Sequence, residues 1–433
     1  MRNRSLTKGI NVDQGNTAFV LIAAALVLLM TPGLAFFYGG MVKAKSVVSM
    51  MMLSFGSLGL IGVLWVLYGY AESFASSDSK TFVGIPGWFG FDTASVGLGK
   101  QVTSALDAHS TSAYPEMAFV AFQATFAIIT VALISGAIAD RAKFGAWMIF
   151  AGVWATLVYF PVANWVFNFG STGDGKFGGW LVALGVHDFA GGTAVHINAG
   201  AAGLALAIVL GKRFGFSKGI TQPHNVPLTL LGVALLWFGW FGFNAGSALG
   251  ANGLASIAFI NTLSAPAAAM LGWIIVEKFR HGKATSIGAG SGAVAGLVAI
   301  TPACDILDPG WGLLLGLLAG ALCALAIDLK FALGFDDSLD VVGIHLVGGI
   351  FGTLFIGFFG RGIGLLDSGK FDQLGKQAIG AGAVLAYSFV LALIIGFVLE
   401  KTIGFRVKAE DEIAGIDTVV HGEEAYAFGA ERG

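Results

Sequence analysis

Charged residues are confined to short segments of this sequence, and the stretches between them are long and apolar. The run from Asn225 to Ile275 contains no Asp, Glu, Lys or Arg. Because a helix needs about 20 mostly apolar residues to cross a bilayer, this run is long enough for two helices, with a turn between Asn244 and Gly253. Eleven uncharged stretches can each span a membrane, at 17–42, 46–71, 117–139, 144–166, 189–211, 226–248, 252–276, 284–304, 309–327, 341–360 and 377–399. The sequence therefore predicts an all-α polytopic membrane protein with eleven transmembrane helices.

The composition excludes other classes of protein. Only 12% of the residues are charged and 56% are hydrophobic, whereas a soluble domain has about 25% charged residues. This apolar content also excludes a disordered chain. Glycine is abundant, at 65 of 433 residues, without the repeat of collagen, and small residues allow membrane helices to pack closely. The net charge of −2 gives no reason to expect a nucleic acid as a partner.

The basic residues predict an orientation. An odd number of spans places the two termini on opposite sides of the membrane. If the C-terminus is cytoplasmic, the inner connections hold eleven Lys and Arg residues and the outer ones six, which agrees with the positive-inside rule, although Arg2, Arg4 and Lys8 oppose it. We therefore predict an extracytoplasmic tail at 1–16, a membrane domain at 17–400 and a cytoplasmic tail at 401–433, in the plasma (bacterial inner) membrane.

Two of the seven histidines, His196 and His345, lie within apolar stretches. Ionisable groups at membrane depth are costly and usually face a cavity, a partner or a transport path. Either each histidine is satisfied separately by a neighbouring hydroxyl or carbonyl, or both line one path and bond to each other as neutral imidazoles. Asp188 and Asp340 precede them at the expected helix starts, where Asp is a favoured N-cap. This similarity hints at two five-span halves, which would be inverted because five is odd.

Aromatic residues suggest a cation site. Phe122 and Phe126 are four residues apart and share a helix face, and Ser247 follows Phe243 by four residues. Aromatic faces attract cations and a hydroxyl accepts hydrogen bonds. Motifs of phosphate-binding loops, zinc proteases and serine hydrolases are absent from the sequence in their required context, and the two cysteines lack metal-ligand spacing. The sequence thus predicts no enzyme, no metal and no cofactor.

With these residues assembled, the chain resembles the ammonium transporter family (Amt, related to the methylammonium permeases and Rh proteins). The motifs that carry the resemblance are PGLAFFYGGM at 32–41, AFQATFA at 121–127, DFAGGTAVHINA at 188–199, WFGFNAGSA at 240–248, DVVGIH at 340–345 and HGEEAY at 421–426. They extend over essentially the whole chain. The resemblance implies a homotrimer of eleven-helix subunits, each with its own pore and built from two inverted five-helix halves plus one extra helix.

The resemblance also implies roles for individual residues. The implied pore residues are the paired histidines His196 and His345, the stacked gate Phe126 and Phe243 with Phe122 beside it, and the walls Phe37, Trp240 and Val341. The implied ammonium-binding residues are Ser247, Asp188, Phe126 and Phe167. The family usually has a tryptophan where this chain has Phe167, in a segment followed by extra loop residues at 171–178. Trp165 and Trp180 are both candidates for the missing indole.

The expected function is that of an ammonium transporter or channel. Ammonium would bind at an outer aromatic site, lose a proton and cross as ammonia through an apolar pore lined by the two histidines. Potassium, which cannot lose a proton, would be stopped by the cost of desolvation. The expected partners are ammonium, with methylammonium as an analogue, other copies of the chain, and a PII-type signalling protein at the cytoplasmic face.

Two other functions are weighed against transport of ammonium. The first is an ammonium sensor with little transport activity, for which a fused signalling domain would be typical, and the tail at 401–433 has no room for one. The second is a transporter of another solute, for which charged residues within the spans or interrupted helices would be typical. The eleven stretches contain no such charge, so ammonium transport is the expected function.

Overall fold

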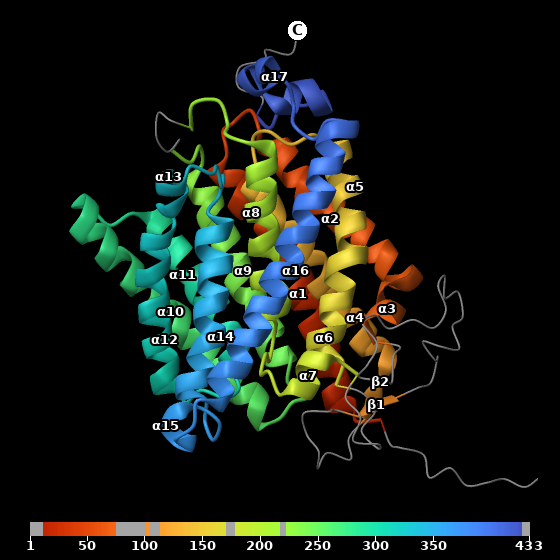
Figure 1. Cartoon of the computed structure of the whole chain (residues 1–433), viewed down its shortest axis with the longest axis vertical. Helices are drawn as coiled ribbons and strands as arrows, with labels where there is room; N and C mark the ends of the chain where they lie inside the picture. Colours follow the sequence, from red (N-terminus) through yellow and green to blue (C-terminus); the bar gives the residue numbers. More distant parts are fainter. Residues whose placement is uncertain (1–11, 75–100, 104–112, 170–177, 217–221, 427–433) are drawn as a thin grey trace, which may run out of the picture.

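Long helices run side by side through the molecule (Figure 1). The computed structural model describes residues 12–74, 101–103, 113–169, 178–216 and 222–426. In this part of the chain, eleven helical segments are long and apolar enough to cross a membrane: Gln14–Met41, Val47–Phe74, Met117–Ile138, Phe144–Phe167, Gly192–Leu210, Val226–Gly246, Gly253–His281, Ser286–Ala303, Pro309–Leu333, Val342–Phe359 and Asp372–Thr402. The predicted all-α fold with eleven spans is therefore confirmed.

The first five spans contain several irregular turns. Their elements are α1 (Gln14–Met41), α2 (Val47–Leu64), a π-helical turn (Trp65–Gly69), α3 (Tyr70–Phe74), α4 (Glu116–Ile134), a 3-10 turn (Ser135–Ile138), α5 (Phe144–Trp154), a second π-helical turn (Ala155–Tyr159), α6 (Phe160–Phe167), η4 (Gly192–Ile197, π-helical) and α8 (Asn198–Leu210). The short helix α7 (Trp180–Leu184) precedes η4. A small antiparallel pair, β1 (Gln101–Thr103) and β2 (Ala113–Pro115), lies between the second and third spans.

The sixth to eleventh spans and the end of the chain also combine long helices with short irregular turns. Their elements are α9 (Val226–Gly246), α10 (Gly253–His281), α11 (Ser286–Ile300), η6 (Thr301–Ala303, 3-10), α12 (Pro309–Ala326), α13 (Leu329–Leu333), η7 (Val342–Leu346, π-helical), α14 (Val347–Phe359), α15 (Leu365–Ser368), the eleventh span α16 (Asp372–Thr402), α17 (Ala409–Ala414) and η8 (Asp417–His421, π-helical).

Polar caps and charged ends explain where the helices begin and end. The side chains of Asp13, Asn252 and Thr285 accept hydrogen bonds from the free amides at the starts of α1, α10 and α11. Several helices are longer than the uncharged stretches, as in α16, predicted at 377–399 and observed from Asp372 to Thr402. Long charged side chains at helix ends can reach the water interface, so the apolar stretch gives a minimum length.

Equivalent spans from the two halves of the chain pack against each other. The first span, α1, packs against the sixth, α9, and the tenth, η7 with α14, packs against the fifth, η4 with α8. The eleventh span, α16, lies across α5, α8 and α14. The members of each pair occupy equivalent places in the two five-span halves and, five spans apart, run in opposite directions. This arrangement places the fifth and tenth spans, which carry the two buried histidines, in contact at the centre.

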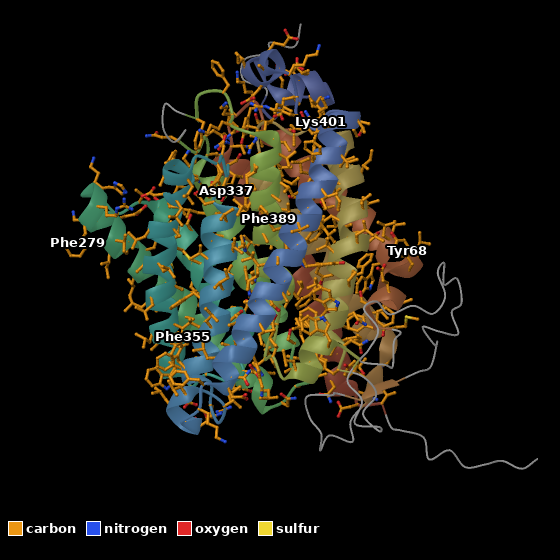
Figure 2. The ribbon with its side chains drawn as sticks, in the orientation of Figure 1. Tyr68, Phe279, Asp337, Phe355, Phe389 and Lys401 are labelled. Carbon is orange, nitrogen blue, oxygen red and sulfur yellow. The ribbon has the colours of Figure 1, made fainter. Side chains whose placement is uncertain are left out.

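The two ends of the bundle differ in what covers them. α7, α15 and the strand pair lie at one end, called the α15 end below, and α13 and α17 lie at the other, the α17 end (Figure 1). Apolar side chains cover much of the outer surface, and Phe279, in the last turn of α10, projects outward with 87% of its surface exposed (Figure 2). Residues 1–11 of the predicted tail at 1–16, residues 171–177 of the extra loop at 171–178, and most of the connection between the second and third spans lie outside the described residues.

Candidate functional site

The two histidines within the spans meet at the centre of the bundle. The Nδ1 atoms of His196 and His345 are 3.3 Å apart, and the rings are nearly parallel with their centroids 5.3 Å apart. Both side chains are buried. A hydrogen bond between two Nδ1 atoms requires one to carry a proton and the other to accept it. Two neutral imidazoles in this arrangement present one Nε2 that accepts and one Nε2 that donates. Within the described part of the chain, His196 Nε2 has no protein partner.

Glycines allow the two histidine-bearing segments to approach each other. A Cβ atom added to Gly200 would lie 2.5 Å from the backbone nitrogen of Leu346, the residue after His345. On the opposite side of the contact, a Cβ at Gly349 would lie 3.1 Å from the side chain of Ile197, the residue after His196. Each glycine lies four residues after the histidine of its own segment, so the same contact is made twice. At Gly200 the observed approach requires a hydrogen in place of a side chain, and at Gly349 an added methyl group would require its neighbours to shift.

Replacing Gly200 by Ala is expected to separate the two segments and to lower stability. The added methyl group meets backbone that cannot rotate away, and overpacking of this kind costs about 1–3 kcal/mol. The matched control is Gly382→Ala in α16, where nothing lies within 4 Å of the added atom. Thermal unfolding of the purified protein in detergent measures the difference. Equal melting temperatures for the two variants would contradict the close contact.

Aspartates hold the starts of both segments. The carboxylate of Asp188 accepts five hydrogen bonds, from the amides of Gly191, Gly192, Thr193 and Ala194 and from the Thr193 hydroxyl. It therefore caps η4, as predicted. In the other half, Asp337 accepts from the amides of Val341 and Val342 at 3.1 and 2.7 Å. Each aspartate lies eight residues before the histidine of its segment.

The expected cap of the second segment was therefore wrong. We expected Asp340 to open the tenth span, but its backbone has a φ of 63° and its carboxylate contacts Lys330 Nζ at 2.5 Å. The left-handed backbone turns the chain between the capping Asp337 and η7, so Asp340 points to a different partner. Asp337 is a site residue that the sequence interpretation missed. The repeated spacing from aspartate to histidine, with seven residues between them, was the signal that could have found it.

A continuous set of aromatic rings leads to the histidine pair. Phe126 of α4 and Phe243 of α9 are stacked, with centroids 4.1 Å apart and an interplanar angle of 18°. Phe122 lies 4.8 Å from Phe126. On the other side, the His196 ring lies 6.1 Å from Phe243 and 5.4 Å from Trp240, nearly parallel to both. Each of these side chains is buried. The stacked pair fills the space between Phe122 and the histidines.

The other predicted binding residues lie on the α15 side of the stacked pair. Ser247 follows the last residue of α9, and its hydroxyl donates to the Phe243 carbonyl at 2.8 Å. A Cβ at the neighbouring Gly246 would touch the ring of Phe122 at 2.9 Å, so Phe122 lies against this turn. Phe167 meets Phe126 edge to face at 6.1 Å. Phe167 thus lies beside the stacked pair of Phe126 and Phe243.

The remaining predicted residues have individual surroundings. Of the two alternative indoles, Trp165 packs against Trp180 at 5.6 Å and against Tyr387 at 4.8 Å. Phe37 is buried in α1, where its ring contacts that of Tyr38. Val341 is buried and directly precedes η7. Gly203 packs against it, because a Cβ added to Gly203 would lie 3.2 Å from the side chain of Val341.

The turn η6 connects several parts of the site. The indole of Trp240 donates to Thr301 Oγ1 at 2.9 Å, and Thr301 in turn donates to the Leu297 carbonyl. The amide of Phe189, the residue after Asp188, donates to the Pro302 carbonyl at 3.2 Å. The ring that stacks on His196 and the aspartate that caps its helix are therefore both fixed to one short segment.

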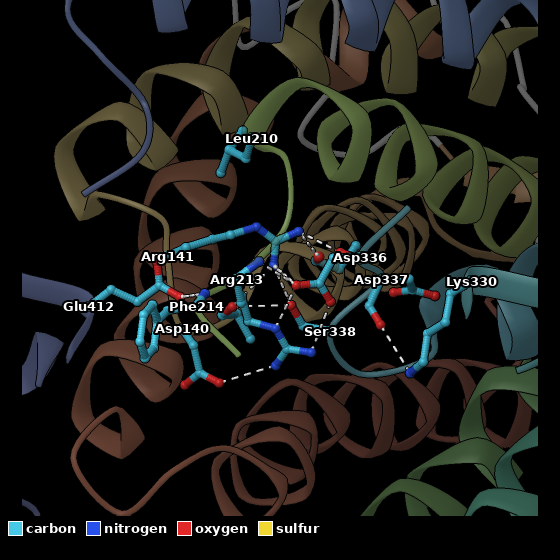
Figure 3. A network of polar contacts seen from close by, with 12 residues as sticks. Asp140, Arg141, Leu210, Arg213, Phe214, Lys330, Asp336, Asp337, Ser338 and Glu412 are labelled. Carbon is cyan, nitrogen blue, oxygen red and sulfur yellow. Dashed lines mark hydrogen bonds and ion pairs between the residues drawn. The ribbon is translucent and has the colours of Figure 1, made fainter. Parts of the chain in front are cut away.

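A network of charges closes the α17 end of the bundle (Figure 3). Asp336 accepts from Arg213 through both oxygens at 2.9 Å, and Arg141 Nη1 lies 3.9 Å from the same carboxylate. Arg141 also donates to Ser338 and to backbone carbonyls. Burial raises the pKa of Asp336, but the two guanidinium groups outweigh it and hold the pKa below its ordinary value of 3.8. Burial lowers the pKa of Arg141 to about 10, so it is charged at neutral pH.

The residues after α16 fold back onto this end. Glu412 of α17 accepts from the Phe214 amide at 2.5 Å and from Arg406 at 2.8 Å. The carboxylate of Asp417 accepts from the first amides of α2, at Val48 and Ser49. Beyond it, the Tyr426 hydroxyl contacts His224 Nε2 at 2.9 Å. The tail is therefore attached to the loops between spans at three places.

Eleven membrane-spanning helices that enclose two paired histidines behind stacked aromatic rings define a polytopic protein of the channel or transporter class. The chain belongs to the Ammonium Transporter Family, whose model matches residues 18–426. The family identified from the motifs is therefore confirmed. Relatives that are 43% and 53% identical to the chain bear the name of ammonium transporter, which is not an enzyme name.

Individual relatives cover nearly the whole chain. An ammonium transporter of Mycobacterium tuberculosis is 53% identical over 443 residues, covering 97% of this chain and 92% of the relative. The crystal structure of Saccharomyces cerevisiae Mep2 is 33% identical with a TM-score of 0.82, covering 94% of this chain and 93% of that one. A structure described as a sensor Amt protein is 29% identical with a TM-score of 0.83, covering 94% and 98%.

Proposed function

We propose that this protein transports ammonium by binding the cation at the α15 end, removing its proton and conducting ammonia past the two histidines. The observation that carries the proposal is the pairing of His196 and His345 directly behind the stacked rings of Phe126 and Phe243. A paired imidazole offers both a donor and an acceptor to a neutral molecule that is itself both, and ammonia is such a molecule.

The proposed binding site lies in front of the stacked rings. The faces of Phe122 and Phe126 and the edge of Phe167 attract a cation, and the lone pairs of Ser247 accept its hydrogen bonds. Asp188 adds a buried negative charge, although its oxygens are already occupied by backbone amides. We therefore assign Asp188 an electrostatic and capping role and not direct contact. Phe167 has no N–H group to donate, so the site offers aromatic faces and hydrogen-bond acceptors. It therefore selects a ligand that is positively charged and that donates hydrogen bonds.

Selectivity follows from the cost of desolvation. Moving an unpaired ion from water into an apolar interior costs many kcal/mol. Potassium meets this cost in full beyond the stacked rings. Ammonium avoids it by leaving its proton behind, because ammonia is uncharged and can hydrogen-bond to the imidazoles. Trp240, stacked on His196, and the buried Phe37 and Val341 complete the apolar surroundings.

We further propose the setting in which this transport occurs. The distribution of basic residues favours a plasma (bacterial inner) membrane protein with the N-terminus and the α15 end outside and the α17 end in the cytoplasm. The likeness to the family favours a homotrimer with one pore in each subunit. The attachment of the tail to three inner loops favours a regulatory role for residues 401–433, with a PII-type protein as the partner at that face. Transport is favoured over sensing because relatives of greater identity bear the name of ammonium transporter.

The test is a concentration jump on proteoliposomes adsorbed to a solid-supported membrane, combined with measured uptake of labelled methylammonium. We expect uptake to saturate as the ammonium concentration rises. An equal concentration of potassium should not affect it, because only ammonium can lose its charge by releasing a proton. Liposomes without protein are the control. Uptake no faster than in these liposomes, or competition by potassium at equal concentration, would contradict the proposal.

A further inference from the structure

A histidine outside the spans lies beside the proposed binding site. His187 directly precedes Asp188, and its Nε2 is 2.9 Å from a carboxylate oxygen of Asp305. Asp305 follows η6, the turn to which the Asp188 segment is also fixed through Phe189 and Pro302. The ion pair therefore joins the two segments that hold Asp188 in place. The His187 side chain is 24% exposed and that of Asp305 is 9% exposed, so water on the α15 side can exchange protons with the imidazole.

The backbone of His187 is fixed independently of its ring. The amide donates to Gln377 Oε1 at 2.8 Å, and the carbonyl accepts from Gln377 Nε2 at 2.7 Å. Gln377 is in turn bonded to Gln373 and to the Thr353 carbonyl. Because this clamp acts on the main chain, the imidazole can gain or lose a proton, or be replaced by another polar side chain, without releasing the loop from α16.

The charge near His187 changes with its protonation. The titratable and charged groups on the elements that surround it are Asp188, Cys304, Asp305, Asp308, Arg361, Asp372 and Lys376. Arg361 pairs with Asp308, and Lys376 pairs with Asp372. With these two pairs balanced, Asp188, Asp305 and His187 carry a net charge of about −2 when the imidazole is neutral and about −1 when it is protonated.

We propose that His187 is a positioning residue of the cation site that acts through Asp188: loss of its proton leaves the site more negative by one charge and tightens the binding of ammonium. The inference rests on the proposed transport function and adds a dependence on external pH. A single charge of this kind, partly screened at the mouth of the site, changes cation affinity by about fivefold. By reciprocity, bound ammonium makes the imidazole easier to deprotonate by the same factor.

Neighbouring charges set the pH range in which His187 loses its proton. Burial lowers the pKa of His187, but contact with Asp305 and the nearby charge of Asp188 outweigh it, so the pKa lies above the ordinary value of 6.5. The protonated form therefore persists to a higher pH than in a free imidazole, and deprotonation occurs above pH 6.5. The Michaelis constant for ammonium should fall over the same interval.

The experiment measures the Michaelis constant and maximal rate of methylammonium uptake into proteoliposomes between about pH 5.5 and 8.5 outside, at constant internal pH. For the wild type we expect the Michaelis constant to fall about fivefold across a single step above pH 6.5. His187→Gln should remove the step and keep the low value throughout. Asp305→Asn should move the step to lower pH, because the anion that holds the proton is lost. The matched control, His281→Gln at the exposed end of α10, should keep the wild-type step.

Three outcomes would overturn the inference. A pH step that is unchanged in His187→Gln contradicts the inference and leaves the transport function intact. A Michaelis constant of His187→Gln that is raised equally at every pH does the same, because it indicates a purely structural role. A wild type without uptake contradicts the transport function and with it the inference. Folding is followed separately: the protonated pair stabilises the native state, so the melting temperature of the wild type should exceed that of His187→Gln below pH 6.5 and approach it as the pH rises through the raised pKa.

Discussion

Replacing either His196 or His345 by Ala is expected to lower ammonium uptake about tenfold. Each change leaves the other imidazole with an unpaired Nδ1 in an apolar interior. An unpaired buried polar group costs about 1–3 kcal/mol, and about 1.4 kcal/mol corresponds to a tenfold change in an equilibrium constant. It also removes one of the two polar groups on which uncharged ammonia depends. Initial rates of methylammonium uptake, at equal protein density in the liposomes, measure the effect.

The double variant distinguishes a shared role from two separate ones. If the histidines act through their common hydrogen bond, the bond is lost only once, and the variant lacking both should be little slower than the worse single variant. Two independent packing roles would instead multiply the losses. His281→Ala, which changes an exposed histidine at the end of α10, should transport at the wild-type rate. Undiminished uptake that still excludes potassium in both single variants would remove the histidines from the mechanism.

The large features of this site could be predicted because each depends on one residue type in an unusual place. His196 and His345 stand out as the two histidines within uncharged stretches, and the structure brings them into contact. The stacking of Phe126 and Phe243 was implied by the resemblance and not by spacing, because this chain contains 36 Phe residues. The eleven spans follow from charge exclusion, which is a strong physical constraint in a bilayer.

Charge and composition alone do not determine details within one helical turn. Asp337 and Asp340 both precede His345, and charge alone does not tell which of them caps the helix; the choice depends on the left-handed backbone at Asp340 and on Lys330. The π-helical form of η4 and η7 has no distinct composition. The position of Phe167 beside Phe126, and of Trp165 against Tyr387, depends on packing between segments far apart in the chain.

Replacing Asp336 by Asn is expected to destabilise the fold by about 3–5 kcal/mol. Asp336 is fully buried and is shared by two guanidinium groups, those of Arg213 and Arg141. Removing its charge leaves the fully buried Arg141 and the partly exposed Arg213, whose side chain is 14% exposed, with Asp140 as the carboxylate that still pairs with Arg213 in the described part of the chain. Breaking a buried pair from one side costs about this much. The amide of Asn has nearly the same shape, so the loss reports charge and not packing. Thermal unfolding in detergent, followed by tryptophan fluorescence, measures it.

The matched control is Asp328→Asn, which removes the same charge from an aspartate–arginine pair of a different burial. Asp328 contacts Arg280 at 2.5 Å, but the side chains are 36% and 41% exposed, and such surface pairs contribute about 0–1 kcal/mol. The pH dependence separates the two cases further. The pKa of Asp336 is depressed in the folded protein, so its contribution is complete above the ordinary value of 3.8 and is lost as the pH falls through the lower, folded value. The wild type should therefore lose its advantage over Asp336→Asn only in strong acid. Equal melting temperatures of Asp336→Asn and Asp328→Asn at neutral pH would contradict a stabilising role for the buried network.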